Sequence, residues 1–112
     1  MLRLKRIYEP YDKEDGFRIL VDRLWPRGIS KERAKLNLWL KDIAPSTQLR
    51  KEFNHNPKKW ISFQNKYKEE IKNNKEVFQQ LKDITKKEKT VTILYAAKDQ
   101  EHNEAVVIRD IL

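Results

Sequence analysis

The sequence predicts a small three-layer α/β domain, in which a short, mainly parallel sheet of about three strands is covered by four or five helices. Two runs, at 18–23 and 91–97, are apolar on both faces, as strands are when helices cover both sides of a sheet. Between and after these runs, apolar residues recur at helical spacing. A chain of 112 residues is long enough for one compact domain and too short for two, so we expect residues 1–112 to form a single unit.

The strands are predicted from alternation and composition. Residues 2–8 alternate between apolar and basic side chains, which is typical of a half-exposed edge strand, and the Pro, Asp and Gly residues of 9–16 predict a loop. The Ile-Leu-Val run within 18–22 predicts a central strand. Because successive side chains of a strand alternate, Asp22 and Arg23 should project to opposite faces at its C-terminal end.

The turn after the central strand leads into the first predicted helix. Trp25 precedes Pro26 and is therefore pushed toward an extended conformation, which prevents a helix from starting early. Gly28 suits a position that needs a positive φ or a close backbone approach. Ser30 can cap a helix that runs from Lys31 to about Leu40.

Four further helices are predicted from caps and apolar stripes. Ser46 can cap a short helix, and Pro57 is tolerated at the first position of the next one. A fourth helix follows through Ile84, and a last helix, with Asp99 as its cap, ends the chain. Their inward-facing residues are Leu49 and Phe53; Trp60, Phe63, Tyr67 and Ile71; Val77, Phe78, Leu81 and Ile84; and Ala105, Ile108 and Ile111.

Composition narrows the classes of function. The chain has no cysteine, which excludes disulfides, zinc knuckles, iron–sulfur clusters and a thiolate nucleophile. No stretch approaches membrane-spanning length and the N-terminus lacks the apolar segment of a signal peptide, so we expect a cytoplasmic protein without a membrane partner. The net charge of +8 favours phosphate-bearing partners or polyanions, although the excess is largely lysine, and a merely solvated basic surface is the alternative.

Several motifs resemble those of a known family. They are Leu20 to Gly28, Trp39 to Ser46, Leu49 and Arg50 with Phe53, His55, Trp60, Phe63 and Tyr67, and Leu94 to Asp99 with Glu101, His102 and Asn103. Together they resemble the YeaO-like proteins of the domain of unknown function 488 family over essentially the whole chain. The resemblance implies a small cytoplasmic bacterial or archaeal α/β domain and says little about activity. Other branches of the wider family place cysteines in the segment equivalent to 95–103, where this chain has none, so thiol chemistry does not carry over from them.

Charged turns follow both central strands, and they form the candidate site. Parallel sheets bind ligands at the carboxyl ends of their strands, so both turns meet at one edge if the strands at 18–23 and 91–97 are parallel neighbours. Two arginines able to bind an oxyanion bidentately, beside a helix N-terminus, suit a phosphate, sulfate or carboxylate. The predicted pocket residues are Asp22, Arg23, Arg27, Lys98, Asp99, His102 and Asn103, with Ser30 at the helix N-terminus.

Each predicted role has a structural alternative. Arg23 and Arg27 would clamp the anion, Asp22 or Asp99 would orient a group or accept a proton, and His102 would shuttle that proton as a general acid or base. Alternatively, the two carboxylates pair with neighbouring basic groups or cap helices and only hold the loops in place, and His102 is an ordinary residue of the first helical turn. Whether the chain is an enzyme acting on a phosphorylated or carboxylated substrate is left open.

Two non-enzymatic classes are alternatives to the anion pocket. A basic module could bind nucleic acid weakly, although acidic residues interrupt its lysines and the aromatic residues between them belong to the predicted core. A protein-interaction domain would use an exposed Trp25 or Trp39. No cofactor and no metal site is predicted, because phosphate-loop, dinucleotide and paired-histidine motifs are absent. The lysines are Lys58, Lys59, Lys66, Lys68, Lys72, Lys75, Lys82, Lys86, Lys87 and Lys89.

Overall fold

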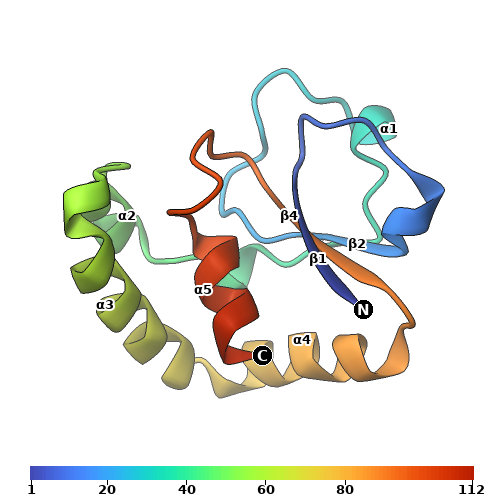
Figure 1. The fold of residues 1–112 in the computed structure, drawn as a ribbon. Helices are drawn as coiled ribbons and strands as arrows, with labels where there is room; N and C mark the ends of the chain where they lie inside the picture. The colour runs from blue at the N-terminus through green and yellow to red at the C-terminus, as the bar shows by residue number, and fades with distance from the viewer.

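The computed structural model describes residues 1–112 and contains a four-stranded sheet (Figure 1). Every pair of neighbouring strands is parallel, which confirms the predicted α/β class. The prediction of about three strands missed one short edge strand. The strands are β1 (Leu2–Arg6), β2 (Phe17–Leu20), β3 (Leu38–Trp39) and β4 (Val91–Tyr95), in the spatial order β1-β4-β2-β3.

The two apolar strands predicted at the centre of the sheet are direct neighbours. Ile19 of β2 lies opposite Ile93 of β4, and Leu20 lies opposite Leu94. The pairing continues past the end of β2, because the Val21 N–H donates to the Leu94 carbonyl at 3.1 Å. The segments that follow β2 and β4 therefore leave the same edge of the sheet side by side, as the location of the candidate site requires.

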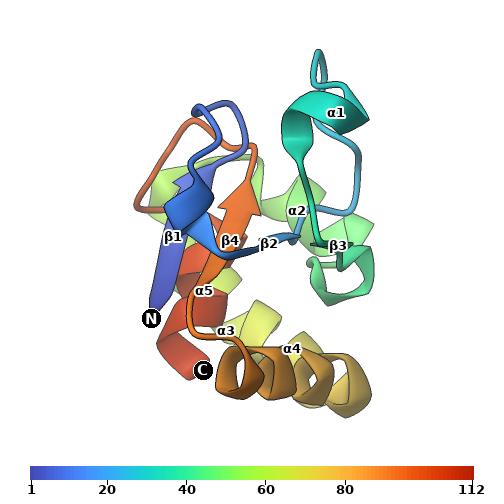
Figure 2. The ribbon, with the colours of Figure 1, turned by 90° about the vertical axis from the view of Figure 1, so that its right-hand side faces the viewer.

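Five α-helices and three short 3-10 turns complete the fold. Figure 2 shows β4 pointing away from α4, and in both views α1 and α4 lie at opposite ends of the molecule. The longest helices have 13 residues, and none combines the length and apolar character that a membrane span needs. The helices are α1 (Lys31–Ala34), α2 (Thr47–Phe53), α3 (Trp60–Lys72), α4 (Lys75–Lys87) and α5 (Glu104–Ile111); the 3-10 turns are Lys13–Asp15, Lys41–Ile43 and Pro57–Lys59.

The sheet separates a large core from a small one. Ile19 and Ile93 face the large core, which α2 to α5 cover, whereas Leu20 and Leu94 face the small one, which contains Ala34 of α1. Alternate residues of each strand thus enter different layers, which is why both faces of these runs are apolar. The predicted three layers are present, but the second face is covered by one helical turn and loops rather than by full helices.

The predicted helix from Lys31 to about Leu40 is wrong beyond Ala34. Lys35 adopts a left-handed conformation with φ 47° and ends α1 after one turn. Leu38 and Trp39 then pair in parallel with β2 as β3, and the Leu40 N–H donates to the Leu20 carbonyl at 2.9 Å. The edge of β2 provides the partners for these backbone hydrogen bonds, and this strand pairing outweighs the local preference of the segment for a helix.

The last helix begins later than predicted. Asn103, not Asp99, is the N-cap of α5, because its side-chain oxygen accepts from the Val106 N–H at 3.1 Å. Asp99 instead accepts from the N–H groups of Glu101 and His102, at 2.9 and 3.1 Å. It therefore shapes the turn between β4 and α5, and so places the side chains that follow it.

Candidate functional site

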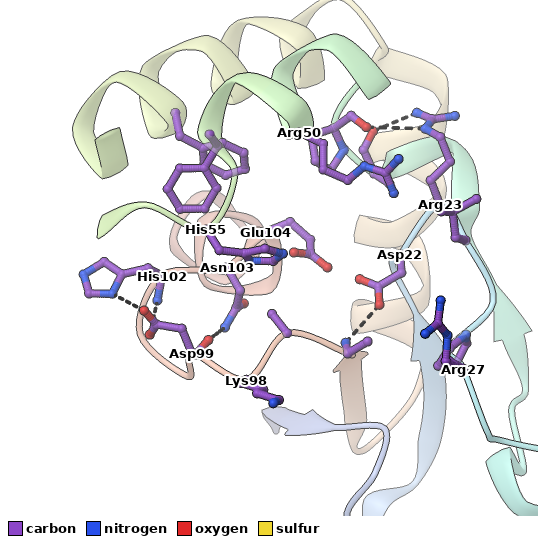
Figure 3. Close-up of a pocket in the computed structure, with 18 of the residues that line it drawn as sticks. Asp22, Arg23, Arg27, Arg50, His55, Lys98, Asp99, His102, Asn103 and Glu104 are labelled. Atoms are coloured by element: carbon purple, nitrogen blue, oxygen red, sulfur yellow. Dashed lines mark hydrogen bonds and ion pairs between the residues drawn. The ribbon is translucent and has the colours of Figure 1, made fainter. Parts of the chain in front are cut away.

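A pocket of about 650 Å³ lies where the segments that follow β2 and β4 leave the sheet (Figure 3). Its size is within the usual range for small-molecule sites. The turn after β2, the start of α2 and the turn before α5 all contribute side chains, so three distant parts of the sequence meet there. The charged and imidazole residues that line it are Asp22, Arg23, Arg27, Arg50, His55, Lys98, Asp99, His102 and Glu104, and its apolar walls include Trp25, Phe53 and Phe63.

Asp22 joins the two turns predicted to form the site. Its Oδ2 accepts from the N–H of Ala96 at 2.9 Å, directly across from the end of β2. Its backbone carbonyl accepts from the indole N–H of Trp39 at 2.7 Å. One Asp22 oxygen is thus committed to the backbone, while the carboxyl group still faces the pocket.

Arg23 is held by backbone carbonyls rather than by a carboxylate. Its Nη2 donates to the carbonyl of Ala44 at 2.9 Å and its Nε donates more weakly to that of Pro45 at 3.4 Å. Because carbonyl oxygens do not neutralise a guanidinium, Arg23 keeps its full positive charge at the pocket wall. These bonds also fix its position.

Three other basic side chains line the pocket without any ion pair or side-chain hydrogen bond within the protein. Arg27 and Lys98 are exposed at the rim, and Arg50 of α2 is half-buried deeper in the wall. The carbonyl of Arg27 accepts from the Tyr8 hydroxyl at 2.8 Å, which fixes the backbone of this turn. Asp42 and Arg50 flank the turn at Pro45, and the sequence predicts either a local surface pair or a position over this pocket. Arg50 lines the pocket, Asp42 does not, and no ion pair joins them.

Glu104 is the principal site residue that the sequence analysis missed. It is the first residue of α5, and Figure 3 shows its carboxyl group and that of Asp22 pointing toward one another. Burial raises the pKa of Glu104 well above its ordinary value, and the negative charge and hydrogen bond of Asp22 raise it further. The ionised form of Glu104 is therefore disfavoured beside Asp22. The signal in the sequence was the acidic residue that directly follows the predicted site residue Asn103.

The predicted pairing of His102 with Asp99 is present. Nδ1 of His102 lies 2.8 Å from Oδ2 of Asp99, and since an ionised carboxylate only accepts, Nδ1 is the donor in this contact. The pKa of Asp99 is lowered mainly by the N–H of Glu101 and then by the His102 side chain. The imidazole also packs edge-on against Trp60, with ring centroids 5.2 Å apart.

The two acidic regions of the pocket are separate. Figure 3 shows the His102 ring on the far side of Asp99 from Asp22 and Glu104. Asp22 therefore has Glu104 as its partner, whereas His102 has Asp99. The structure does not bring Asp22 and His102 together as a single catalytic pair.

Asn103 and Ser30 have structural partners. Asn103 is buried and uses both polar atoms of its side chain, because its Nδ2 also donates to the Asp99 carbonyl at 2.9 Å. Ser30 accepts from the Arg33 N–H at 3.1 Å as the cap of α1, and it does not line the pocket. The helix N-terminus expected to support anion binding is thus outside the site.

The aromatic residues considered for the two alternative surfaces, one for nucleic acid and one for a protein partner, are at least partly buried. Trp25 and Trp39 are half-buried and pack edge-to-face at 5.3 Å, and Trp25 donates to the Ile29 carbonyl at 2.6 Å. The aromatic residues between the lysines of α3, Phe63 and Tyr67, are buried in the large core, as predicted. No three His, Asp or Glu side chains come together in an arrangement that could hold a metal ion.

Comparisons with known proteins find matches that cover essentially the whole chain. A family model described as the inactive DUF488-N3 subclade matches residues 1–112. The chain is 43% identical over 111 residues to "Uncharacterized protein YeaO" of Escherichia coli (strain K12), which covers 99% of this chain and 96% of that protein. It is 35% identical over 111 residues to "Uncharacterized protein Rv3073c" of Mycobacterium tuberculosis (strain ATCC 25618 / H37Rv), which covers 99% of this chain and 92% of that protein. No solved structure matches the chain significantly.

Proposed function

This chain belongs to the inactive DUF488-N3 subclade, which confirms the family resemblance of its motifs, and on that premise we propose that its pocket binds a small anion, a phosphate or carboxylate, without turning it over. The word inactive in the description of the family supports binding without catalysis. The relatives YeaO and Rv3073c are described only as uncharacterized, so they name no ligand for this pocket.

The observation that carries the proposal is the set of unpaired basic side chains in one concave site. Arg27, Arg50 and Lys98 have no partner within the protein, and Arg23 is held only by neutral carbonyls. Guanidinium groups bind phosphate and carboxylate through paired N–H donors, and desolvation inside a pocket strengthens such bonds. The net charge of +8 adds long-range attraction for an anion.

Acid–base catalysis is a second candidate, favoured by the 2.8 Å contact between Asp99 and His102. An imidazole oriented by a carboxylate can accept or donate a proton near neutral pH. The half-buried edge of the pocket where His102 lies would have to meet the ligand for this role. Release of inorganic phosphate from phosphate monoesters, abolished by His102→Ala, would select this candidate over simple binding.

The anion proposal is tested by NMR titration of the full chain with methyl phosphate and with acetate. We expect saturable chemical-shift changes at the backbone amides of residues 22–27 and 96–104. Arg27→Ala and Arg50→Ala should each weaken binding by about tenfold to a hundredfold, since a hydrogen bond to a charged group contributes about 1.5–3 kcal/mol. Arg33→Ala removes an exposed arginine outside the pocket and should leave the affinity unchanged.

Two results would contradict the anion pocket. One is the absence of saturable shifts with either probe. The other is equal weakening by Arg27→Ala and Arg33→Ala, which would mean that general surface charge attracts the anion. Salt-dependent oligonucleotide binding that survives Arg27→Ala but is lost on charge reversal of Lys58, Lys59 and Lys66 would favour the nucleic-acid alternative instead.

A further inference from the structure

The charges inside the pocket are divided by sign. Glu104 and Asp22 form an acidic wall, whereas Arg50, Arg27 and Lys98 are placed around it. In many ion-paired sites such groups neutralise one another, but no ion pair within the protein involves any of these five side chains. Charges of both signs are therefore available to a ligand in the same cavity.

A simple anion uses only part of this arrangement. It would pair with Arg27 or Arg50 while lying in the same small cavity as the Asp22 and Glu104 carboxyl groups, which repel it whenever the pair is ionised. A ligand that also carries a positive hydrogen-bond donor gains from both walls. An ammonium group placed between the two carboxyl groups would donate hydrogen bonds to both and offset their mutual repulsion.

We infer that the pocket binds a small zwitterion, with a phosphate or carboxylate at Arg27, Arg50 and Lys98 and an ammonium group at the carboxyl pair of Asp22 and Glu104. This inference rests on the proposed anion pocket and specifies its ligand. The raised pKa of Glu104 agrees with it, because burial and the negative charge of Asp22 outweigh the attraction of Arg50, and no ion pair holds this carboxyl group.

The size and the walls of the pocket suit a short chain between the two charged ends. The volume of about 650 Å³ exceeds what a single oxyanion needs. Phe53 and Phe63 stack at 4.4 Å between their ring centroids and contribute apolar wall, and Trp25 contributes more near Arg27. Methylene groups that link an ammonium to an oxyanion would be covered by this apolar surface.

The experiment compares matched probes by isothermal titration of the full chain. ω-Aminoalkyl phosphates with two to six methylene groups are each paired with the alkyl phosphate of equal length, and ω-amino carboxylic acids with the matching alkyl carboxylic acids. We expect at least one amino compound to bind tenfold or more tightly than its partner without the amine. A preference in the first series identifies a phosphate as the anionic end, and one in the second series identifies a carboxylate.

Variants then locate the ammonium. Glu104→Gln and Asp22→Asn should each reduce the preference for the amino compound to less than threefold, while the alkyl phosphate binds at least as well as to the unchanged protein. Asp22→Asn keeps an oxygen that can accept from the Ala96 N–H, so the turn retains its tie. Glu32→Gln, an exposed carboxylate of α1 outside the pocket, is the matched control.

The outcomes separate the two proposals. Equal or tighter binding of the alkyl compounds overturns the zwitterion and leaves the anion pocket intact. A preference for the amine that persists in both Glu104→Gln and Asp22→Asn also overturns it, because the carboxyl pair would then not be the recognising group. Failure of every probe to bind overturns the anion pocket and the zwitterion together.

Discussion

Gly16 and Gly28 are the two glycines of the chain, and both have a positive φ, of 66° and 80°. Their surroundings differ. A Cβ atom on Gly16 would lie 2.3 Å from the Thr90 carbonyl oxygen, which also accepts from the Phe17 N–H, whereas a Cβ atom on Gly28 would meet nothing within 4 Å. The sequence prediction for Gly28 is thus correct for its positive φ, and the close backbone approach belongs to Gly16.

This difference predicts unequal effects of the same substitution. Gly28→Ala should lower the free energy of unfolding by about 1–2 kcal/mol, which is the usual cost of a left-handed conformation for a residue with a Cβ atom. Gly16→Ala should cost at least about 1 kcal/mol more, because the backbone at Thr90, directly before β4, must also shift. Urea denaturation of both variants measures the two losses. Equal losses would mean that the loop before β2 relaxes freely.

Site residues could be predicted from the sequence where they follow a recognisable strand, but not where only the tertiary fold brings them to the pocket. Asp22, Arg27, Asp99 and His102 follow the ends of two recognisable strands, and the parallel pairing of those strands brings their turns together. For Glu104 the only signal was its position directly after Asn103, and its role could not be inferred, because it depends on a carboxyl group more than eighty residues away in the sequence, at Asp22. Electrostatic pairs of this kind are properties of the folded chain.

At the scale of elements, α2 begins at a cap that is tied to a second helix. The Ser46 hydroxyl accepts from the Leu49 N–H at 3.1 Å and donates to a carboxylate oxygen of Glu70 in α3 at 2.6 Å. The Ser46 N–H donates to the other oxygen of Glu70 at 2.8 Å. This carboxylate therefore fixes the start of α2 against α3, and Arg50 on the first turn of α2 depends on that placement.

Ser46→Ala should lower the free energy of unfolding by about 2 kcal/mol. The variant loses the cap, which is commonly about 1 kcal/mol, and leaves one oxygen of the half-buried Glu70 carboxylate without its donor. Thr47→Ala, at the exposed first position of the same helix, is the control and should change stability by less than about 0.5 kcal/mol. Urea denaturation measures both. A loss for Ser46→Ala no larger than the control would show that Glu70 and water replace the hydroxyl.

The elements themselves differ in how far the sequence predicts them. The stripes of α3 and α4 continue over 13 residues each, so their periodicity is unambiguous, and the Ser46 cap marks α2 correctly. β3 has only two residues and follows a left-handed turn at Lys35. Two residues carry no periodicity, and the strand exists because the edge of β2 supplies partners. Its prediction would have required the sheet to be known first.

At the scale of the whole molecule, one buried carboxylate joins most of the sheet. Asp15 is 1% exposed and accepts from Lys5 of β1 at 3.1 Å and from Arg18 of β2. Its backbone carbonyl accepts from the Thr92 hydroxyl of β4 at 2.7 Å. Arg18 in turn donates to the Ala34 carbonyl of α1 at 2.9 Å. The cluster thus links three strands and the helix that covers their smaller core.

The pH dependence of stability follows from the pKa of Asp15. Burial alone would raise that pKa, but hydrogen bonds from the Asp12 N–H, Lys5 and Arg18 outweigh burial and lower it below its ordinary value of 3.8. The folded state therefore holds the Asp15 proton less tightly than the unfolded state does. Its stabilising contribution is complete above the unfolded pKa and is lost as the pH falls through the folded one.

Asp15→Asn should consequently lower the free energy of unfolding near neutral pH by about 3–5 kcal/mol, since it leaves Arg18 buried without its counter-charge. The loss should shrink as the pH is lowered from neutrality to below the ordinary Asp pKa of 3.8, because the unchanged protein then gives up the contribution of the Asp15 charge. Asp110→Asn, which removes a carboxylate from an exposed ion pair with Arg109, should cost less than about 1 kcal/mol at any pH. Urea denaturation across this range measures all three proteins. A constant difference between Asp15→Asn and the unchanged protein would show that Asp15 acts through packing and hydrogen-bond geometry rather than through its charge.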